Sequence, residues 1–242
     1  MRIFILFLLL TGSLFNCLAQ NITEHIYGRQ GSAEEHPQQL VATPDGSFLI
    51  AGYKTTPGSA GHFDAFIQKT DADGQPLWRR TYGGAANDLA LSVAPTPDGG
   101  FVFGGYTESE GQGRADGFVK KADAAGNLQW TTLFGNTGWD QVTNVQAAAA
   151  GGYLLCGTAV YDKAARKQDA FWALLDAQGN ILTHKIMAQA AHIDEAYEIK
   201  ESPDGNIVVL YRNFYYTCAK YTPAGQLIWA REFNDSEFGN FR

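Results

Sequence analysis

The sequence contains little cysteine, fewer basic than acidic residues and no long apolar segment beyond its first residues. Three cysteines among 242 residues are too few for the disulfide framework that stabilises small secreted domains. The 18 basic residues face 25 acidic ones and form no cluster, so nucleic acid is excluded as an expected partner. With 45% hydrophobic residues, a chain of this length can bury a core without disulfides or metal ions.

The first 19 residues have the features of a signal peptide. Arg2 precedes the apolar run IFILFLLL, and Cys17 and Ala19 stand three residues and one residue before the expected cleavage point. A lipoprotein acylated at Cys17 is the alternative, but Asn16 stands where a small residue is expected. Removal of the segment takes Arg2 with it and leaves a net charge of −8, with no transmembrane segment in the rest of the chain. We therefore expect a secreted, periplasmic or cell-surface protein.

A repeat runs through residues 20–242. The stretch TPDGSFLIAGY begins at Thr43, and TPDGGFVFGGY begins at Thr96, 53 residues later. Four units of about 50 residues each contain four short segments rich in β-branched and aromatic residues, separated by turn residues. In the second unit these segments are ALSVAPT, FVFGGYT, DGFVKKA and LQWTTLF. Four antiparallel strands per unit is the size of one blade of a β-propeller, so the sequence predicts an all-β array of four four-stranded blades.

The repeated residues suggest how the blades turn and pack. Asp-Gly pairs precede the second strands and predict hairpin turns in which the glycine has positive φ; these glycines are Gly46, Gly99 and Gly205. Glycine also recurs inside the second strands, which predicts a close approach between sheets; these positions are Gly52, Gly105 and Gly157. A tryptophan recurs in the fourth strand and is predicted to pack between blades; the series is Trp78, Trp130 and Trp229, with Thr183 in its place in the third unit.

Two partial units flank the four complete ones. ITEHIYGRQ matches a fourth strand, and SEFGNFR matches the beginning of a first strand. They predict an incomplete ring or an open arc that self-associates through exposed edges. A closed ring of four blades is the alternative.

The pattern PDGGFVFGGYT…DGFVKKADAAGNLQWTTLFG resembles the propeller repeats of large secreted proteins from Bacteroidota and related bacteria. The resemblance extends over essentially the whole chain after the signal. It implies a β-propeller of the extracellular space or cell envelope and assigns no activity. Many members of that group end in a C-terminal sorting domain, whereas this sequence ends at EFGNFR.

No motif of a catalytic or metal site is recognisable. The five histidines fall at non-equivalent positions of the repeat, and no nucleophile elbow or phosphate-binding loop occurs in the context that would support one. Cys156 and Cys218 lie in apolar runs that are typical of buried free thiols. No cofactor, metal or catalytic residue is therefore predicted, with one alternative that concerns calcium.

The calcium alternative rests on four carboxylates at the handover from one blade to the next: Glu35, Asp88, Asp140 and Asp194. They could bind backbone amides one by one, or form a ring at the mouth of the channel that binds cations or cationic ligands. A second acidic series begins the third strands, where a hydrogen bond closing the loop is expected; it comprises Asp64, Asp116 and Asp169.

The loops between second and third strands differ in length and sequence, as binding loops on a rigid scaffold do. We expect a non-enzymatic binding or scaffold module for a protein or glycan of the cell envelope, because almost every polar residue repeats whereas catalytic groups break internal symmetry. The alternative is a propeller enzyme, either a lyase or hydrolase or a quinoprotein-like oxidoreductase, that uses acidic residues at the channel mouth.

Overall fold

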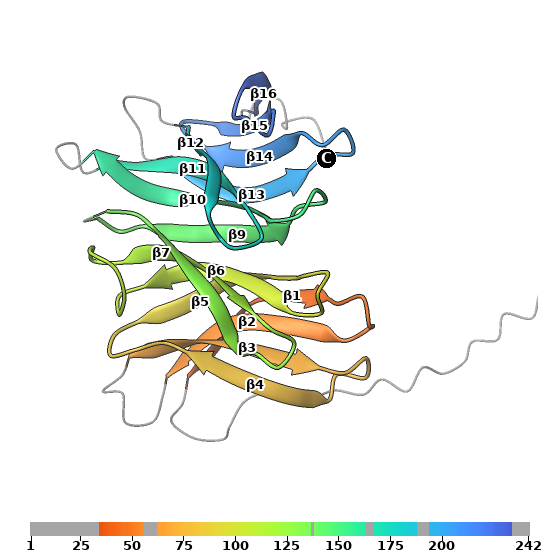
Figure 1. The fold of residues 1–242 in the computed structure, drawn as a ribbon. Helices are drawn as coiled ribbons and strands as arrows, with labels where there is room; N and C mark the ends of the chain where they lie inside the picture. The colour runs from red at the N-terminus through yellow and green to blue at the C-terminus, as the bar shows by residue number, and fades with distance from the viewer. Residues whose placement is uncertain (1–33, 56–61, 137, 163–166, 188–193, 234–242) are drawn as a thin grey trace, which may run out of the picture.

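The computed structural model describes residues 34–55, 62–136, 138–162, 167–187 and 194–233 (Figure 1). The predicted signal peptide and the two predicted partial units lie outside these residues. The described residues form four antiparallel sheets, each built from four consecutive strands, so the predicted fold is confirmed. No helix in this part of the chain has the length and hydropathy needed to cross a membrane.

We name the sheets blades A to D in chain order. Blade A comprises β1 (Glu35–Ala42), β2 (Phe48–Thr55), β3 (Phe63–Thr70) and β4 (Pro76–Tyr82). Blade B comprises β5 (Asp88–Pro95), β6 (Phe101–Thr107), β7 (Asp116–Ala122) and β8 (Leu128–Phe134). Blade C comprises β9 (Gln141–Ala147), β10 (Tyr153–Asp162), β11 (Lys167–Leu175) and β12 (Ile181–Ile186). Blade D comprises β13 (Glu195–Glu201), β14 (Ile207–Arg212), β15 (Tyr216–Tyr221) and β16 (Leu227–Phe233).

The hairpin turns are alike in all four blades. In the first of them, the Gly46 amide donates to the Thr43 carbonyl at 3.0 Å and the Thr43 amide donates to the Ser47 carbonyl at 2.9 Å, the pattern of a tight turn followed by a glycine bulge. The φ angles are 82° at Gly46, 80° at Gly99 and 74° at Gly205. Because the strands alternate in direction, the hairpin turns lie along one edge, the turn rim, and the remaining loops and blade connections lie along the other, the loop rim.

The glycines inside the second strands have a different role from the one predicted. A Cβ atom at Gly105 would lie 1.8 Å from the Leu89 carbonyl oxygen, and one at Gly157 would lie 2.1 Å from the Gln141 carbonyl oxygen. Both carbonyls belong to the first strand of the same blade, where the pairing of the two strands shifts at a bulge. The close approach is therefore between strands of one sheet, because the bulge turns a carbonyl toward the neighbouring strand.

Successive residues of one strand lie in two different hydrophobic cores. Phe101 faces blade A, whereas the next residue, Val102, faces blade C. In blade C, Leu155 faces blade B and Leu154 faces blade D. Side chains of a strand point alternately to its two faces, so each inner blade contributes to the core on either side.

A side-chain hydrogen bond crosses each interface at the same repeat position. An oxygen in the first strand of one blade accepts the amide N–H of the first strand of the next blade. The pairs are Gln39 with Val93 at 2.7 Å, Ser92 with Val145 at 3.1 Å and Asn144 with Ile199 at 3.4 Å. These bonds fix how far one sheet is displaced along its neighbour.

The predicted tryptophans contact the following blade where one is present. Trp78 stacks on Phe101 with ring centroids 5.7 Å apart, and Trp130 packs against Tyr153 at 5.3 Å. The Trp130 Nε1 also donates to the Ala177 carbonyl at 3.2 Å. Trp229, predicted to pack in the same way, is 39% exposed, because no strand follows β16 in the described residues.

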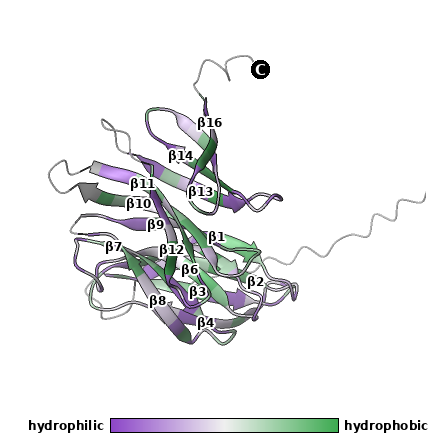
Figure 2. Cartoon of the chain, turned by 45° about the horizontal axis from the view of Figure 1, so that its top comes forward, coloured by the Kyte–Doolittle hydropathy of each residue, from purple (hydrophilic) through white to green (hydrophobic). Residues whose placement is uncertain are grey.

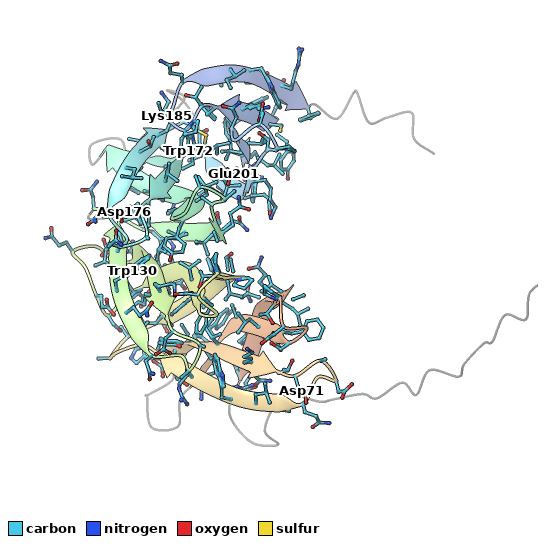
Figure 3. All side chains as sticks on the ribbon, turned by 45° about the vertical axis from the view of Figure 1, so that its right-hand side comes forward. Asp71, Trp130, Trp172, Asp176, Lys185 and Glu201 are labelled. Atoms are coloured by element: carbon cyan, nitrogen blue, oxygen red, sulfur yellow. The ribbon has the colours of Figure 1, made fainter. Side chains whose placement is uncertain are left out.

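The four blades form an open arc. Contacts between sheets run from A to B, from B to C and from C to D. Figure 3 shows the arc from the side, with blade A, which carries Asp71, at one end and blade D at the other. Among the two predicted arrangements, the described residues adopt the open one.

A turn-rim ion pair recurs with the repeat. The turn aspartate binds the lysine near the end of the third strand in blades A, B and D; the pairs are Asp45–Lys69 at 2.9 Å, Asp98–Lys121 at 2.8 Å and Asp204–Lys220 at 2.7 Å. Blade C has Ala150 and Leu174 at these two positions, so both partners are replaced together. Burial works to raise the pKa of Asp98, but hydrogen bonds from Lys121, Thr96 and the Gly100 amide outweigh it and lower this pKa to about 2.

Replacement of Asp98 alone should destabilise the protein more than replacement of the pair. Asp98→Ala leaves Lys121, whose side chain is only 3% exposed, without its carboxylate partner, and we expect a loss of about 1–3 kcal/mol in the free energy of unfolding. The Asp98→Ala/Lys121→Leu variant copies blade C and should recover part of that loss in urea titrations. A double variant that is less stable than the single one would contradict this account of the pair.

The same pair predicts a dependence on pH. The pKa of Asp98 is lower in the folded protein than its ordinary value of 3.8, so its contribution is fully present above that value and disappears as the pH falls toward 2. Asp98→Ala should therefore lose less stability than the wild type between pH 4 and 2. Thermal melts measure this difference. If the Tm of the wild type and that of Asp98→Ala fall equally steeply between pH 4 and 2, the prediction is wrong.

The backbone conformation at Gly99, and not a steric contact, should determine how much stability a substitution at this position costs. A Cβ atom there would meet no atom within 4 Å, but φ is 80°. Gly99→Val should lower the free energy of unfolding by about 1–3 kcal/mol because a β-branched residue is strained in this region. Gly99→Asn is the control, since asparagine tolerates positive φ, and it should cost clearly less in the same denaturation experiment. Equal losses for the two variants would show that the turn selects glycine for another reason.

Candidate functional site

Two of the four handover carboxylates bind the backbone of their own loops. Asp88 is buried, and its Oδ2 accepts the Gly84 amide at 2.8 Å and the Ser109 hydroxyl at 2.7 Å. Asp140 is also buried; one oxygen accepts the Asn136 amide at 2.8 Å and the other accepts the Val160 amide. The bonds of Asp88 tie the connection between blades A and B to the loop after β6, and those of Asp140 tie the connection between blades B and C to the end of β10.

The other two handover carboxylates are Glu35 and Asp194. Glu35 forms an ion pair with Arg79 at 2.7 Å, and the same guanidinium donates to the Gln68 side chain at 2.8 Å and lies 4.7 Å from the centre of the Phe66 ring. Asp194 is completely buried. Within the described residues, no three His, Cys, Asp or Glu side chains lie together in a way that could hold a metal ion. The structure therefore does not bring the four carboxylates together as one site.

Burial affects the charge of these groups. The pKa of Asp140 is raised by its burial, and the nearby charge of Asp116 acts in the same direction, whereas the amides of Val160 and Asn136 oppose the shift. Burial likewise raises the pKa of the Cys156 thiol to about 12. Cys156 and Cys218 are both free, and a buried thiol with a raised pKa is a poor nucleophile.

The second acidic series also closes loops. Asp116 accepts the amides of Gln112 and Gly113, both at 2.9 Å, through one carboxylate oxygen. This is the role that the sequence predicts for the aspartate at the start of a third strand. Asp64 and Asp169 occupy the equivalent strand positions in blades A and C.

Aromatic side chains gather at the loop rim, a feature that the sequence analysis did not identify. In blade A, His36 stacks on Tyr53 with ring centroids 4.7 Å apart, and Tyr53 lies edge-on to Phe63 at 5.2 Å. Between blades B and C, Tyr106 packs against Trp139 at 4.8 Å, and Trp139 remains 36% exposed. The recurrence of tyrosine in LIAGY and VFGGY is the one signal that could have indicated this cluster.

Two hollows lie away from the aromatic cluster. One, of about 160 Å³, lies at the turn rim between blades A and B and is lined by Trp78, Phe101 and the Asp45–Lys69 pair, among others. The other, of about 170 Å³, lies on the outer face of blade A and is lined by Glu35, Pro37, Ile50, Phe66, Gln68 and Arg79. The Gln68 side chain is buried there, and its Nε2 has no hydrogen-bond acceptor among the residues that the structure describes.

The handover carboxylates should contribute to stability without calcium. Asp140→Ala leaves the buried Val160 amide and the half-buried Asn136 amide without an acceptor, and we expect a loss of about 1–3 kcal/mol in the free energy of unfolding. Asp140→Asn keeps one acceptor and should cost less. Millimolar calcium should leave the Tm of the wild type unchanged. A calcium-dependent rise in Tm that the Asp88→Asn/Asp140→Asn variant lacks would show that these carboxylates do bind cations.

Comparisons with known proteins identify a fold and no family. A comparison with models of known families gave no match, and neither did a search of curated proteins. Among solved structures, a protein of unknown function from Bacteroides caccae is similar, with 11% identity, a TM-score of 0.53 and coverage of 83% of this chain and 62% of that one. The propeller of Dos1 is similar with 11% identity, a TM-score of 0.50 and coverage of 82% and 61%. The chain thus spans about three fifths of the length of these two structures, and at this identity the likeness shows the β-propeller fold alone.

Proposed function

We propose that the protein is a non-enzymatic binding module of the extracellular space or cell envelope, and that its loop rim binds a protein or glycan. The proposal of export rests on the predicted signal peptide and on the resemblance to secreted propeller repeats. The observation that carries the binding proposal is two groups of partly exposed aromatic side chains at the loop rim, one formed by His36, Tyr53 and Phe63 and the other by Tyr106 and Trp139.

Aromatic rings suit this role because they offer a large apolar surface at little cost in conformational entropy. Within each group the rings pack against one another, so little freedom remains to be lost on binding. The ends of the second and third strands, which the most variable loops of the sequence join, lie at the same rim. A ligand bound there would contact a rigid aromatic surface and, around it, loops that can vary without disturbing the sheets.

The polar groups of the rim favour binding over catalysis. Both oxygens of Asp140 and one oxygen of Asp88 accept hydrogen bonds from nearby backbone amides. Acid–base catalysis would require such a carboxylate within reach of a substrate. The enzymatic alternative, with channel-mouth carboxylates as its reactive groups, therefore has no specific support in this geometry.

Removal of the most exposed ring should weaken binding. We expect Trp139→Ala to reduce affinity at least tenfold for a ligand found on arrays of surface oligosaccharides and envelope peptides, because buried aromatic contacts dominate binding energies. Leu182→Ala is the control, since Leu182 is exposed on β12 and away from the loop rim. Titration calorimetry with the ligand from the array measures both variants.

Two results would contradict the proposed function. One is an affinity that Trp139→Ala and Tyr53→Ala leave unchanged while both variants melt as the wild type does. The other is turnover of the bound oligosaccharide or peptide by the purified protein, with loss of turnover in Asp88→Asn.

A further inference from the structure

The two ends of the arc expose positions that are buried at every interface within it. Leu40 on β1 is 61% exposed, whereas Val93, Val145 and Ile199, at the same position of the repeat, are at most 3% exposed. On blade D, Leu210 is 37% exposed and Tyr216 is 50% exposed. Hydrophobic residues, green in Figure 2, thus lie on strands at both ends of the arc as well as inside it. These end faces are blade interfaces that no neighbour covers in the described residues.

The two end faces correspond to the two sides of one interface. Within the A–B core, Ala51 and Ala65 of blade A pack with Phe103 and Phe118 of blade B. The positions equivalent to the two alanines in blade D are occupied by Leu210 and Tyr216, and those equivalent to the two phenylalanines in blade A are occupied by Ile50 and Phe66.

The sizes of these residues are complementary. Blade D has large side chains, Leu210 and Tyr216, where the inner interfaces have alanine, glycine or cysteine. Blade A has a hollow of about 170 Å³ on its outer face, lined by Ile50 and Phe66 among others. The added bulk of one end face therefore matches the space on the other. A phenol oxygen would also offer the acceptor that Gln68 Nε2 lacks in that hollow.

Blade D also has a polar side chain at the position that forms the hydrogen bond across the inner interfaces. Gln39, Ser92 and Asn144 accept the amide N–H of the next blade, and Glu198 holds the same position in blade D. Its partner at the next interface would be the amide of Leu40, because Leu40 holds the position of Val93. Trp229 repeats the position of Trp78. Blade D thus carries, in Glu198 and Trp229, both the polar and the aromatic side chain that contact the next blade at the inner interfaces.

From this match we propose that two copies of the chain associate head to tail, with blade D of each copy packed on blade A of the other. Two arcs of four blades each then make a closed ring of eight blades, at the upper end of the usual range of four to eight. A ring of three copies would exceed that range. A second copy is the occupant that provides both required faces at once, and a closed two-fold ring leaves no edge for further growth. The proposal is independent of what the loop rim binds.

The mass of the purified protein in solution tests this proposal. Sedimentation equilibrium and light scattering should give twice the mass of the chain at micromolar concentration. Leu40→Glu and Leu210→Glu each place a charge in one half of the interface and should each give a monomer. Leu182→Glu is the matched control, because Leu182 is 62% exposed and belongs to neither end face, and it should leave the dimer intact. Far-ultraviolet circular dichroism and the Tm establish that each variant is folded.

Mixing the two monomeric variants tests the direction of association. In a head-to-tail arrangement, the intact blade D of Leu40→Glu can pack on the intact blade A of Leu210→Glu, so an equimolar mixture should form a dimer with one interface. A wild type that is monomeric across this concentration range would overturn the proposal. So would a dimer that Leu40→Glu leaves intact, or a mixture of the two variants that stays monomeric while both are folded.

Discussion

The inner sheets of this protein, blades B and C, are apolar on both faces, and a sheet of that kind is stable in water only when another sheet covers each face. Blades B and C meet this condition inside the arc, where successive residues such as Phe101 and Val102 enter cores on opposite sides. The repeat follows from the same constraint, because a sheet that presents the same two faces as its neighbours can always be covered by another sheet like itself. The side-chain hydrogen bonds between first strands then fix the displacement of each sheet relative to the next.

Polar residues of the repeat stabilise this stack at both rims. The turn aspartates bind lysines at the turn rim, and the handover aspartates Asp88 and Asp140 accept amides at the loop rim. Groups of the same type recur because each blade has the same unpaired amides to satisfy. The residues that depart from the repeat are therefore the more informative ones for function. Trp139 is one of them, since it lies in a connection between blades and remains partly exposed.

The constraint that stacks the blades also bears on how copies of the chain associate. The two faces of the inner blades are covered, whereas no described residue covers the outer faces of blades A and D, which expose Leu40 and Leu210. An exposed blade face favours association for the same physical reason that stacks the blades within the chain. The residues of blade D that are larger than their counterparts indicate a surface shaped for a particular neighbour, whereas a face that merely lacked a neighbour would keep the inner pattern.

The sequence by itself determined the four units, their four strands and the turn glycines, because these depend on local propensities and on a period that can be read directly from residues such as Thr43 and Thr96. It also predicted the amide-binding role of Asp116, since that hydrogen bond is local. Only the tertiary structure decided that Gly105 faces a carbonyl of its own sheet and that Glu35 pairs with Arg79. The aromatic rim and the open arc also required it, because these features depend on how far one blade is rotated against the next. That rotation results from packing over the whole interface, and no single segment of the sequence records it.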